Sequence, residues 1–227
     1  MGKLRYLGHA AFYVEGAGIK ALIDPFLTGN PQAGEGPDSW TELDYIFVTH
    51  AHGDHLGDTV AIAQRTGATI VATNELAVYL SGKGLKATGM HIGGRTAFPF
   101  GKVKLTPAFH GSSMFEEGKM TCSDTPCGFL LEIDGKKIYH AGDTGLTVEM
   151  SLLEAEGVDV ALVPIGGHYV MDIDDAVRAV GFIKPKKTVP IHYNTFPPIK
   201  ADGAEFVQKA AIKTEVIIMK PGETLTF

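Results

Sequence analysis

Cysteine is scarce in this chain of 227 residues, which holds two, Cys122 and Cys127, with four residues between them. Two cysteines are too few for the disulfide framework of a small secreted protein, and no matching pair completes a zinc-thiolate site. We therefore predict two free thiols in a reducing compartment, with a redox pair as the weaker alternative.

Long apolar runs are also missing. No stretch approaches the roughly 20 apolar residues that a membrane-spanning helix needs. The N-terminal residues, MGKLRYLGHAAFYVEG, lack the apolar segment behind a basic start that marks a signal peptide. We expect a cytoplasmic protein without a membrane partner.

Positive charge is not in excess, because 20 Lys and Arg residues stand against 26 Asp and Glu residues and the formal net charge is -6. This balance gives no electrostatic reason to bind nucleic acid or an anionic membrane. The hydrophobic content of 44% allows a sizeable core, and no linker rich in Ser, Gly or Pro divides the chain. We predict a single domain over residues 1–227 and leave a homo-oligomer open.

Strand-like and helical segments alternate along the chain. In the first half, strands are predicted at 3–8, 11–16, 19–25, 43–48 and 68–73, and helices at 58–67 and 74–84, the latter with Asn74 as N-cap. The second half repeats this plan with strands at 101–110, 158–167, 187–193 and 215–227, a hairpin at 127–143, and helices at 147–157, 172–185 and 203–212. Two similar halves predict an α/β (α+β) fold in which two sheets pack face to face with helices outside, a four-layer αββα sandwich.

Two long loops interrupt these elements. Residues 27–41 are rich in Gly and Pro and carry the only tryptophan, Trp40, whereas residues 111–126 are polar. Loops of this length often border a functional site. We predict that they shape the substrate-binding region.

Histidines and isolated aspartates repeatedly follow apolar strands. The residues in such positions are Asp24, His50, His110, Asp143, His168 and His192. In a sheet-based fold, strand ends gathered at one edge are where sites are built. These side chains are therefore expected to converge.

The segment HAHGDH, residues 50–55, carries the strongest signal. His50 and His52 are two apart in an extended chain, so their side chains point the same way and can bind one ion. Gly53 allows a sharp bend, after which Asp54 and His55 face a neighbouring position. One short segment thus offers two ligands to each of two ions, and His110, Asp143 and His192 are residue types that complete such sites.

These motifs resemble the metallo-β-lactamase superfamily. The resemblance rests on THAHGDH at 49–55, FH at 109–110, AGDT at 141–144, PIHY at 190–193 and the acid of IDP at 23–25, in the order of the family. LGHAAF at 7–12 and VPIGGHY at 163–169 resemble one branch, which holds uncharacterised metal-dependent hydrolases and is similar to the lactonase acting on ascorbate 6-phosphate. The chain lacks the large insertion of the nucleases and the flavin or rubredoxin-like domains of other branches.

The resemblance implies the αββα fold and a ligand set for two metal ions. The first ion would be held by His50, His52 and His110, and the second by Asp54, His55 and His192. Asp143 would bridge the two ions. Asp24 would support the loop that carries the histidines without binding metal.

Such a centre keeps positive charge by formal counting, attracts an electron-rich oxygen and lowers the pKa of bound water. We expect hydrolysis by a metal-bridged hydroxide of a small, anionic ester, lactone or phosphodiester, with Asp54 and Asp143 as catalytic residues. Zinc is the favoured metal, and manganese and iron remain open. The alternatives are a thioester or nucleic-acid hydrolase on the same scaffold, or a metal-binding protein without catalysis.

The remaining histidines differ in their expected roles. His168 is predicted to face the substrate as an oxyanion donor or leaving-group acid, with a structural hydrogen bond as the alternative. For His9 a structural role is slightly favoured over a supporting contact behind the metal ligands. His91 and His140 are predicted to be structural, and we expect Lys184, Lys186 and Lys187 to face solvent rather than bind phosphate.

Overall fold

Two seven-stranded sheets form the centre of the molecule in the computed structural model, which describes residues 1–116 and 118–227. The first sheet has the spatial order β16 (Thr224–Thr226), β1 (Lys3–Gly8), β2 (Ala11–Gly16), β3 (Ile19–Ile23), β4 (Tyr45–Phe47), β5 (Thr69–Thr73) and β6 (Ala87–Met90). The second has the order β15 (Glu215–Val216), β14 (Lys187–Ile191), β13 (Val160–Pro164), β12 (Lys136–His140), β11 (Cys127–Ile133), β8 (Gly101–Pro107) and β7 (Arg95–Phe98).

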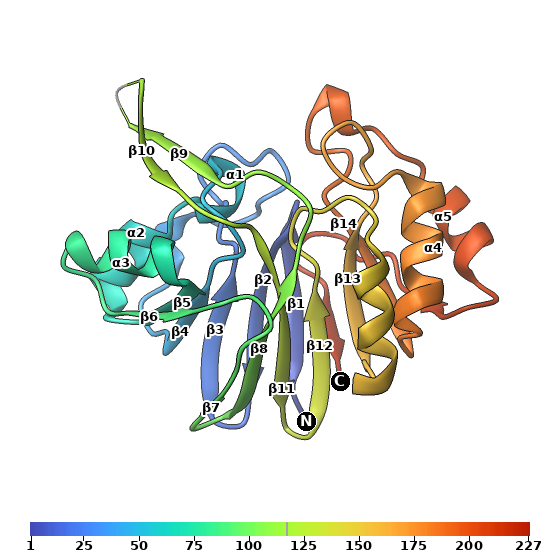
Figure 1. Cartoon of the computed structure of the whole chain (residues 1–227), viewed down its shortest axis with the longest axis horizontal. Helices are drawn as coiled ribbons and strands as arrows, with labels where there is room; N and C mark the ends of the chain where they lie inside the picture. Colours follow the sequence, from blue (N-terminus) through green and yellow to red (C-terminus); the bar gives the residue numbers. More distant parts are fainter. Residues whose placement is uncertain (117) are drawn as a thin grey trace.

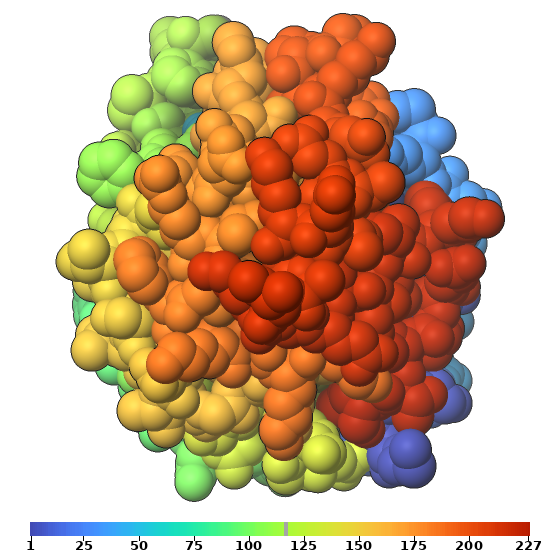
Figure 2. All heavy atoms as spheres, turned by 90° about the vertical axis from the view of Figure 1, so that its right-hand side faces the viewer, coloured from blue at the N-terminus to red at the C-terminus, as the bar shows by residue number. Residues whose placement is uncertain are grey.

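The helices lie outside the two sheets. They are α1 (Gly53–Leu56), α2 (Thr59–Thr66), α3 (Asn74–Gly82), α4 (Ile173–Ile183) and α5 (Gly203–Ala210), with the 3-10 segments η1 (Pro37–Ser39), η2 (Val148–Glu156) and η3 (Pro197–Ile199). Helices α2 and α3 flank one side of the paired sheets and α4 and α5 the other (Figure 1). The C-terminal part of the chain, drawn orange to red, covers much of the α4 and α5 side (Figure 2). The predicted four-layer αββα sandwich is confirmed.

The two halves of the chain build their sheets on the same plan. Strands β1, β2 and β3 pair antiparallel, and β3 to β6 continue in parallel. Strands β8, β11 and β12 pair antiparallel, and β12 to β15 continue in parallel. Parallel strands covered on both faces are apolar along their whole length, and every residue of β13 is buried. This plan brings the C-terminal ends of β4, β8, β12 and β14 to one edge of the sandwich.

Apolar side chains fill three layers. The layer between the sheets includes Phe12, Phe47 and Phe129, with the rings of Phe47 and Phe129 packed edge to face at 5.5 Å. Separate clusters lie under α2 and α3 and under α4 and α5. Helix α4 shows how the sequence encodes this packing, since Ala176, Ala179, Val180 and Ile183 recur on one buried face.

Several element boundaries differ from the sequence predictions. Asn74 is the first residue of α3 and not its N-cap, because Thr73 occupies the cap position in extended backbone. The predicted helix at 147–157 is a 3-10 segment. The strand predicted at 43–48 is hydrogen-bonded as a ladder only from Tyr45 to Phe47. No helix among the described residues is both long and apolar enough to cross a bilayer.

The two loops singled out from the sequence contain regular elements and a core residue. Residues 111–126 contain a two-stranded hairpin of β9 (Ser113–Glu116) and β10 (Lys119–Ser123), which stands beside α1 (Figure 1). In the loop at 27–41, Trp40 is buried against Tyr13 and Arg5 and is part of the core. Cys122 and Cys127 are buried free thiols.

An ion-pair cluster around Glu156 fastens η2 to the second sheet. Its carboxylate accepts hydrogen bonds from Lys104 of β8 at 2.9 Å and from Lys137 of β12 at 3.4 Å, and it pairs with Arg95 of β7. Burial alone would raise the pKa of Glu156, but the bonds from Lys104 and Arg95 outweigh it and lower the pKa to about 2. A depressed pKa of this kind stabilises the fold above the unfolded value of about 4.5, and the contribution is lost as the pH falls towards about 2.

We predict that Glu156→Gln lowers the free energy of unfolding at neutral pH by about 1–2 kcal/mol, because it removes the charge that three basic side chains share. The variant should also lose less stability than the wild type between about pH 4.5 and pH 2. Denaturant melts across this range measure both effects. The control is Glu154→Gln, whose side chain is 54% exposed and pairs with Lys184 at the surface; an equal effect of both variants would contradict the prediction.

Candidate metal centre

The strand ends that carry the predicted ligands meet at one edge of the sandwich. His50 follows β4, α1 carries Asp54 and His55, and three further residues follow β8, β12 and β14, namely His110, Asp143 and His192. Helix α1 lies at the upper edge of the sheets in Figure 1. Three groups of ligand-bearing side chains form there, each with ligand atoms within 4.8 Å of one another: His50, His52 and His110; His50, His55 and Asp143; and His9, Asp54, His55 and His192.

The first group consists of three imidazoles. His50 is buried, and its Nε2 lies 3.1 Å from Nδ1 of His52. The ring of His110 lies 5.3 Å from that of His50 and 5.1 Å from that of His52. His52 and His110 are partly exposed, so this side of the centre is open to solvent.

Asp143 stands between the groups. Its Oδ1 lies 3.1 Å from Nε2 of His55, and its Oδ2 lies 3.1 Å from Nε2 of His192 and 3.6 Å from Nε2 of His110. The side chain is 3% exposed. One buried carboxylate is thus within contact distance of imidazoles that come from three distant parts of the chain.

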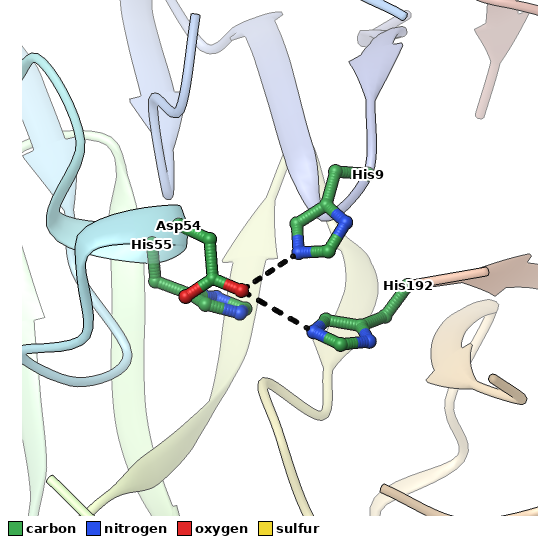
Figure 3. Close-up of side chains that lie close together, drawn as sticks. All are labelled: His9, Asp54, His55 and His192. Carbon is green, nitrogen blue, oxygen red and sulfur yellow. Dashed lines mark hydrogen bonds and ion pairs between the residues drawn. The ribbon is translucent and has the colours of Figure 1, made fainter. Parts of the chain in front are cut away.

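Asp54 gathers the last group, which Figure 3 shows. Its Oδ2 lies 3.3 Å from Nε2 of His9 and 3.7 Å from Nε2 of His192 (Figure 3). The rings of His9 and His192 are 4.0 Å apart, and the backbone N–H of His192 donates to the carbonyl of His9. His9 Nδ1 lies 2.8 Å from the hydroxyl of Thr195.

The ring of His9 lies within the ligand cluster, a position that fits the supporting contact that the sequence left open beside a structural role. The sequence signal that could have placed it there was the motif LGHAAF itself. His9 adopts a positive φ of 58° in the turn between β1 and β2. This conformation, uncommon for a residue with a side chain, directs the ring to the same edge as α1.

Comparison with known proteins agrees with this geometry. A family model described as "Beta-lactamase superfamily domain" matches residues 20–193. The chain belongs to the beta-lactamase superfamily. Within it, the chain is similar to UPF0173 metal-dependent hydrolases, with 55% identity to that of Carboxydothermus hydrogenoformans (97% of this chain and 98% of the relative). It shares 50% identity with that of Alkaliphilus metalliredigens (99% of this chain and 100% of the relative).

The fold is also that of a solved relative. The structure of Igni18, described as a novel metallo hydrolase from Ignicoccus hospitalis, is 43% identical and superposes with a TM-score of 0.91, covering 100% of this chain and 98% of the other. The chain is thus a member of a family of metal-dependent hydrolases.

In this superfamily member, Asp24 fixes the segment that carries the histidines. Asp24 accepts hydrogen bonds from the backbone N–H and the hydroxyl of Thr49 at 2.8 and 2.7 Å, and it lies 2.7 Å from Nδ1 of His55. Burial alone would raise the pKa of Asp24, but the neighbouring His55 outweighs burial and lowers it. Asp24 is in none of the three ligand groups, so its contacts agree with the supporting role that the family resemblance implies.

Gly142 allows the strand end of Asp143 to pass close to the histidine segment. Its φ is +62°, and a Cβ there would lie 2.8 Å from the carbonyl oxygen of Cys127 and 2.9 Å from Cβ of Thr49. A residue with a side chain would push β12 away from the segment that begins at Thr49.

The electrostatics of the cluster fit a cation. Burial alone would lower the pKa of His55, but Asp143 and Asp24 raise it well above its ordinary value. Burial would likewise lower the pKa of His192, and Asp143 raises it to about 9. Neighbouring carboxylates, with Asp143 common to both, thus favour positive charge at His55 and His192, which is the charge that a metal ion supplies there.

The hydrogen bonding points the same way. Among the described residues, His55 Nε2, Asp143 Oδ1 and both ring nitrogens of His192 are buried without a well-aligned hydrogen-bond partner, although His55 Nε2 and Asp143 Oδ1 are 3.1 Å apart. Buried polar atoms are rarely left unpaired. Nitrogen and oxygen atoms that crowd together without hydrogen-bond geometry are what ligands of a shared cation provide.

The other histidines lie outside the three groups. His168 is exposed, and its ring packs edge to face on Tyr169 at 4.3 Å. His140 is buried, with Nε2 2.8 Å from the carbonyl of Ala10, which confirms its structural role. His91 lines a separate cavity with Asp124. Lys184 pairs with the exposed Glu154, and Lys186 pairs with the mostly buried Asp159.

We predict that Gly57→Ala disrupts the centre, because Gly57 ends α1 with a φ of +44° and a Cβ there would lie 2.7 Å from Cα of Phe26. The expected loss is about 2 kcal/mol or more of unfolding free energy, together with weaker binding of added zinc. The matched control is Gly53→Ala at the other end of α1, where a Cβ meets nothing within 4 Å. Thermal melts and zinc titration compare the two; equal behaviour would contradict the prediction.

Proposed function

We propose that this chain is a hydrolase that uses two divalent metal ions. The observation that carries the proposal is the position of the buried Asp143 carboxylate between imidazoles of both ligand groups, 3.1 Å from His55 and His192 and 3.6 Å from His110. One ion would be held by His50, His52 and His110, the other by Asp54, His55 and His192, with Asp143 shared between them. These residue types suit zinc, the metal we favour, and also manganese or iron.

The chemistry that divalent ions would supply there is polarisation of a carbonyl or phosphoryl oxygen and a lower pKa of bound water. The protein's own residues hold the candidate ligands in position. Asp24 holds His55 from behind, and Thr49 contacts both Asp24 and the ring of His50. Side chains held by such hydrogen bonds keep their ligand atoms in place while the substrate is converted to product.

The substrate we propose is a small ester, lactone or phosphodiester with an electron-rich, anionic reactive group. The support is electrostatic, since the positive charge of two divalent ions exceeds the negative charge of the Asp54 and Asp143 carboxylates. The open side of the centre at His52 and His110 gives access for a small molecule. His168 remains a proposed contact to the substrate. In its loop, the N–H of Gly167 donates to the carbonyl of Met171, and the N–H of Met171 donates to the carbonyl of Thr144, which follows β12.

The first test is metal dependence. The purified protein should contain about two metal ions and hydrolyse a member of a panel of phosphodiesters, lactones and thioesters, and a chelator should abolish this activity. Asp143→Asn should lower metal content and reduce kcat by at least about 100-fold, since the shared charge is lost. Metal analysis and steady-state kinetics measure both.

Asp134→Asn is the matched control, because Asp134 lies in the β11–β12 turn with a positive φ that asparagine also adopts. It should leave metal content and rate unchanged. Full metal content and full activity in Asp143→Asn would rule out the shared carboxylate. A protein that binds two ions and hydrolyses nothing in the panel would favour the alternative of a metal-binding protein without catalysis.

We further expect His9 to orient Asp54 through Nε2. His9→Gln places an amide N–H near the position of Nε2, whereas His9→Asn places one near Nδ1 and leaves Asp54 without this partner. His9→Asn should therefore weaken binding of one metal ion by about 10–100-fold and His9→Gln by much less.

Backbone strain alone would rank the two variants the other way, because asparagine tolerates the positive φ at position 9 better than glutamine does. Competitive metal titration with a chromophoric chelator measures the affinities. Equal loss of one ion from both variants would show that His9 binds the metal directly and would contradict the orienting role.

A further inference from the structure

An apolar cavity adjoins the open side of the centre. It has a volume of about 530 Å³ and lies between α1 and β9. His52 contributes to its wall, so the cavity reaches a residue of the first ligand group. Any substrate bound at the centre therefore has this space beside it.

The wall of this cavity is mostly apolar. Ala51, Leu56, Met114 and Phe115 supply its apolar surface, and no Lys, Arg, Asp or Glu is among the described residues that line it. An anionic or strongly hydrated group would gain nothing there and would lose contact with water. An alkyl or aryl group would instead replace water against apolar atoms.

Phe115 is an exposed part of this wall. Its side chain is 62% exposed, whereas the neighbouring Met114 packs on the core cluster under α2 and α3. Met114 pairs with the buried Cys122 across the hairpin, which fixes the position of β9. Strand β9 is thus fixed in position and presents the exposed ring of Phe115 close to His52.

We propose that this cavity is a subsite for an apolar substituent of the substrate, an alkyl or aryl group attached next to the bond that is hydrolysed. The inference rests on the proposed function, because it places the reactive group of the same substrate at His52 and its neighbours. The substrate class becomes an amphiphilic ester, lactone or phosphodiester, with an electron-rich group at the metal ions and an apolar group against Phe115.

The test measures binding without requiring turnover. Straight-chain hydroxamates, from acetohydroxamate to octanohydroxamate, bind metal through a constant head group and differ only in alkyl length. With the zinc-loaded protein, isothermal titration should show the dissociation constant falling by about fourfold for each added methylene until the cavity is full. Phe115→Ser should flatten this dependence and leave acetohydroxamate binding unchanged, and Phe115→Leu should keep most of it.

Val78→Ser is the control, because Val78 is also an exposed apolar residue and is not part of the cavity wall. It should retain the wild-type dependence on chain length. An affinity that does not change with chain length, or a dependence that survives Phe115→Ser, would overturn the subsite.

The two proposals fail in different ways. If short esters were hydrolysed, but chain length affected neither their hydrolysis nor hydroxamate binding, the subsite would be ruled out and the hydrolase would stand. A chain-length effect on hydroxamate binding with no hydrolysis of any ester, lactone or phosphodiester would keep the subsite and remove the hydrolase. If acetohydroxamate did not bind the zinc-loaded protein, the metal centre on which both proposals depend would be ruled out.

Discussion

The buried carboxylate of Asp143 is the contact on which the centre depends. It is nearly inaccessible to solvent, yet it faces His55, His110 and His192 at 3.1 to 3.6 Å. A buried negative charge is costly unless positive charge or hydrogen bonds compensate it. The fold provides that compensation by directing the ends of β8 and β14 and the helix α1 towards the end of β12. Positive charge from a cation or from imidazolium is therefore a requirement of this edge of the sandwich.

The fold keeps the centre in place through contacts that bind no metal in the proposed arrangement. Asp24, at the end of β3, holds both Thr49 and His55. Gly142 lets β12 end close to Thr49, and Gly57 ends α1 where a side chain would collide with Phe26. These positions act through the backbone, so the geometry of the ligands is built into the ends of the strands and into α1. The helices α4 and α5 and the core between the sheets support this edge from a distance.

The two sides of the centre differ in character. On one side His9 and His192 are buried and contact the partly exposed carboxylate of Asp54, whereas on the other side both His52 and His110 are partly exposed. The apolar cavity adjoins the exposed side. A cluster of charged and imidazole side chains beside an apolar cavity fits the amphiphilic substrate that we propose, which refines the small anionic substrate expected from charge alone.

The sequence by itself determined the fold class and predicted which residues would gather as candidate ligands, because alternating apolar strands, amphipathic helices and the segment HAHGDH are local patterns. The division of residues 50–55 between two ions stays a prediction from spacing, made from two short-range properties, alternation in extended backbone and a bend at Gly53. Tertiary structure decided what depends on distant segments. It brought His9 beside Asp54, left His168 exposed next to Tyr169, and turned the predicted loop at 111–126 into a hairpin. The physical reason is that contacts such as His9 with Thr195, 186 residues apart, arise from sheet packing and leave no periodic signal along the chain.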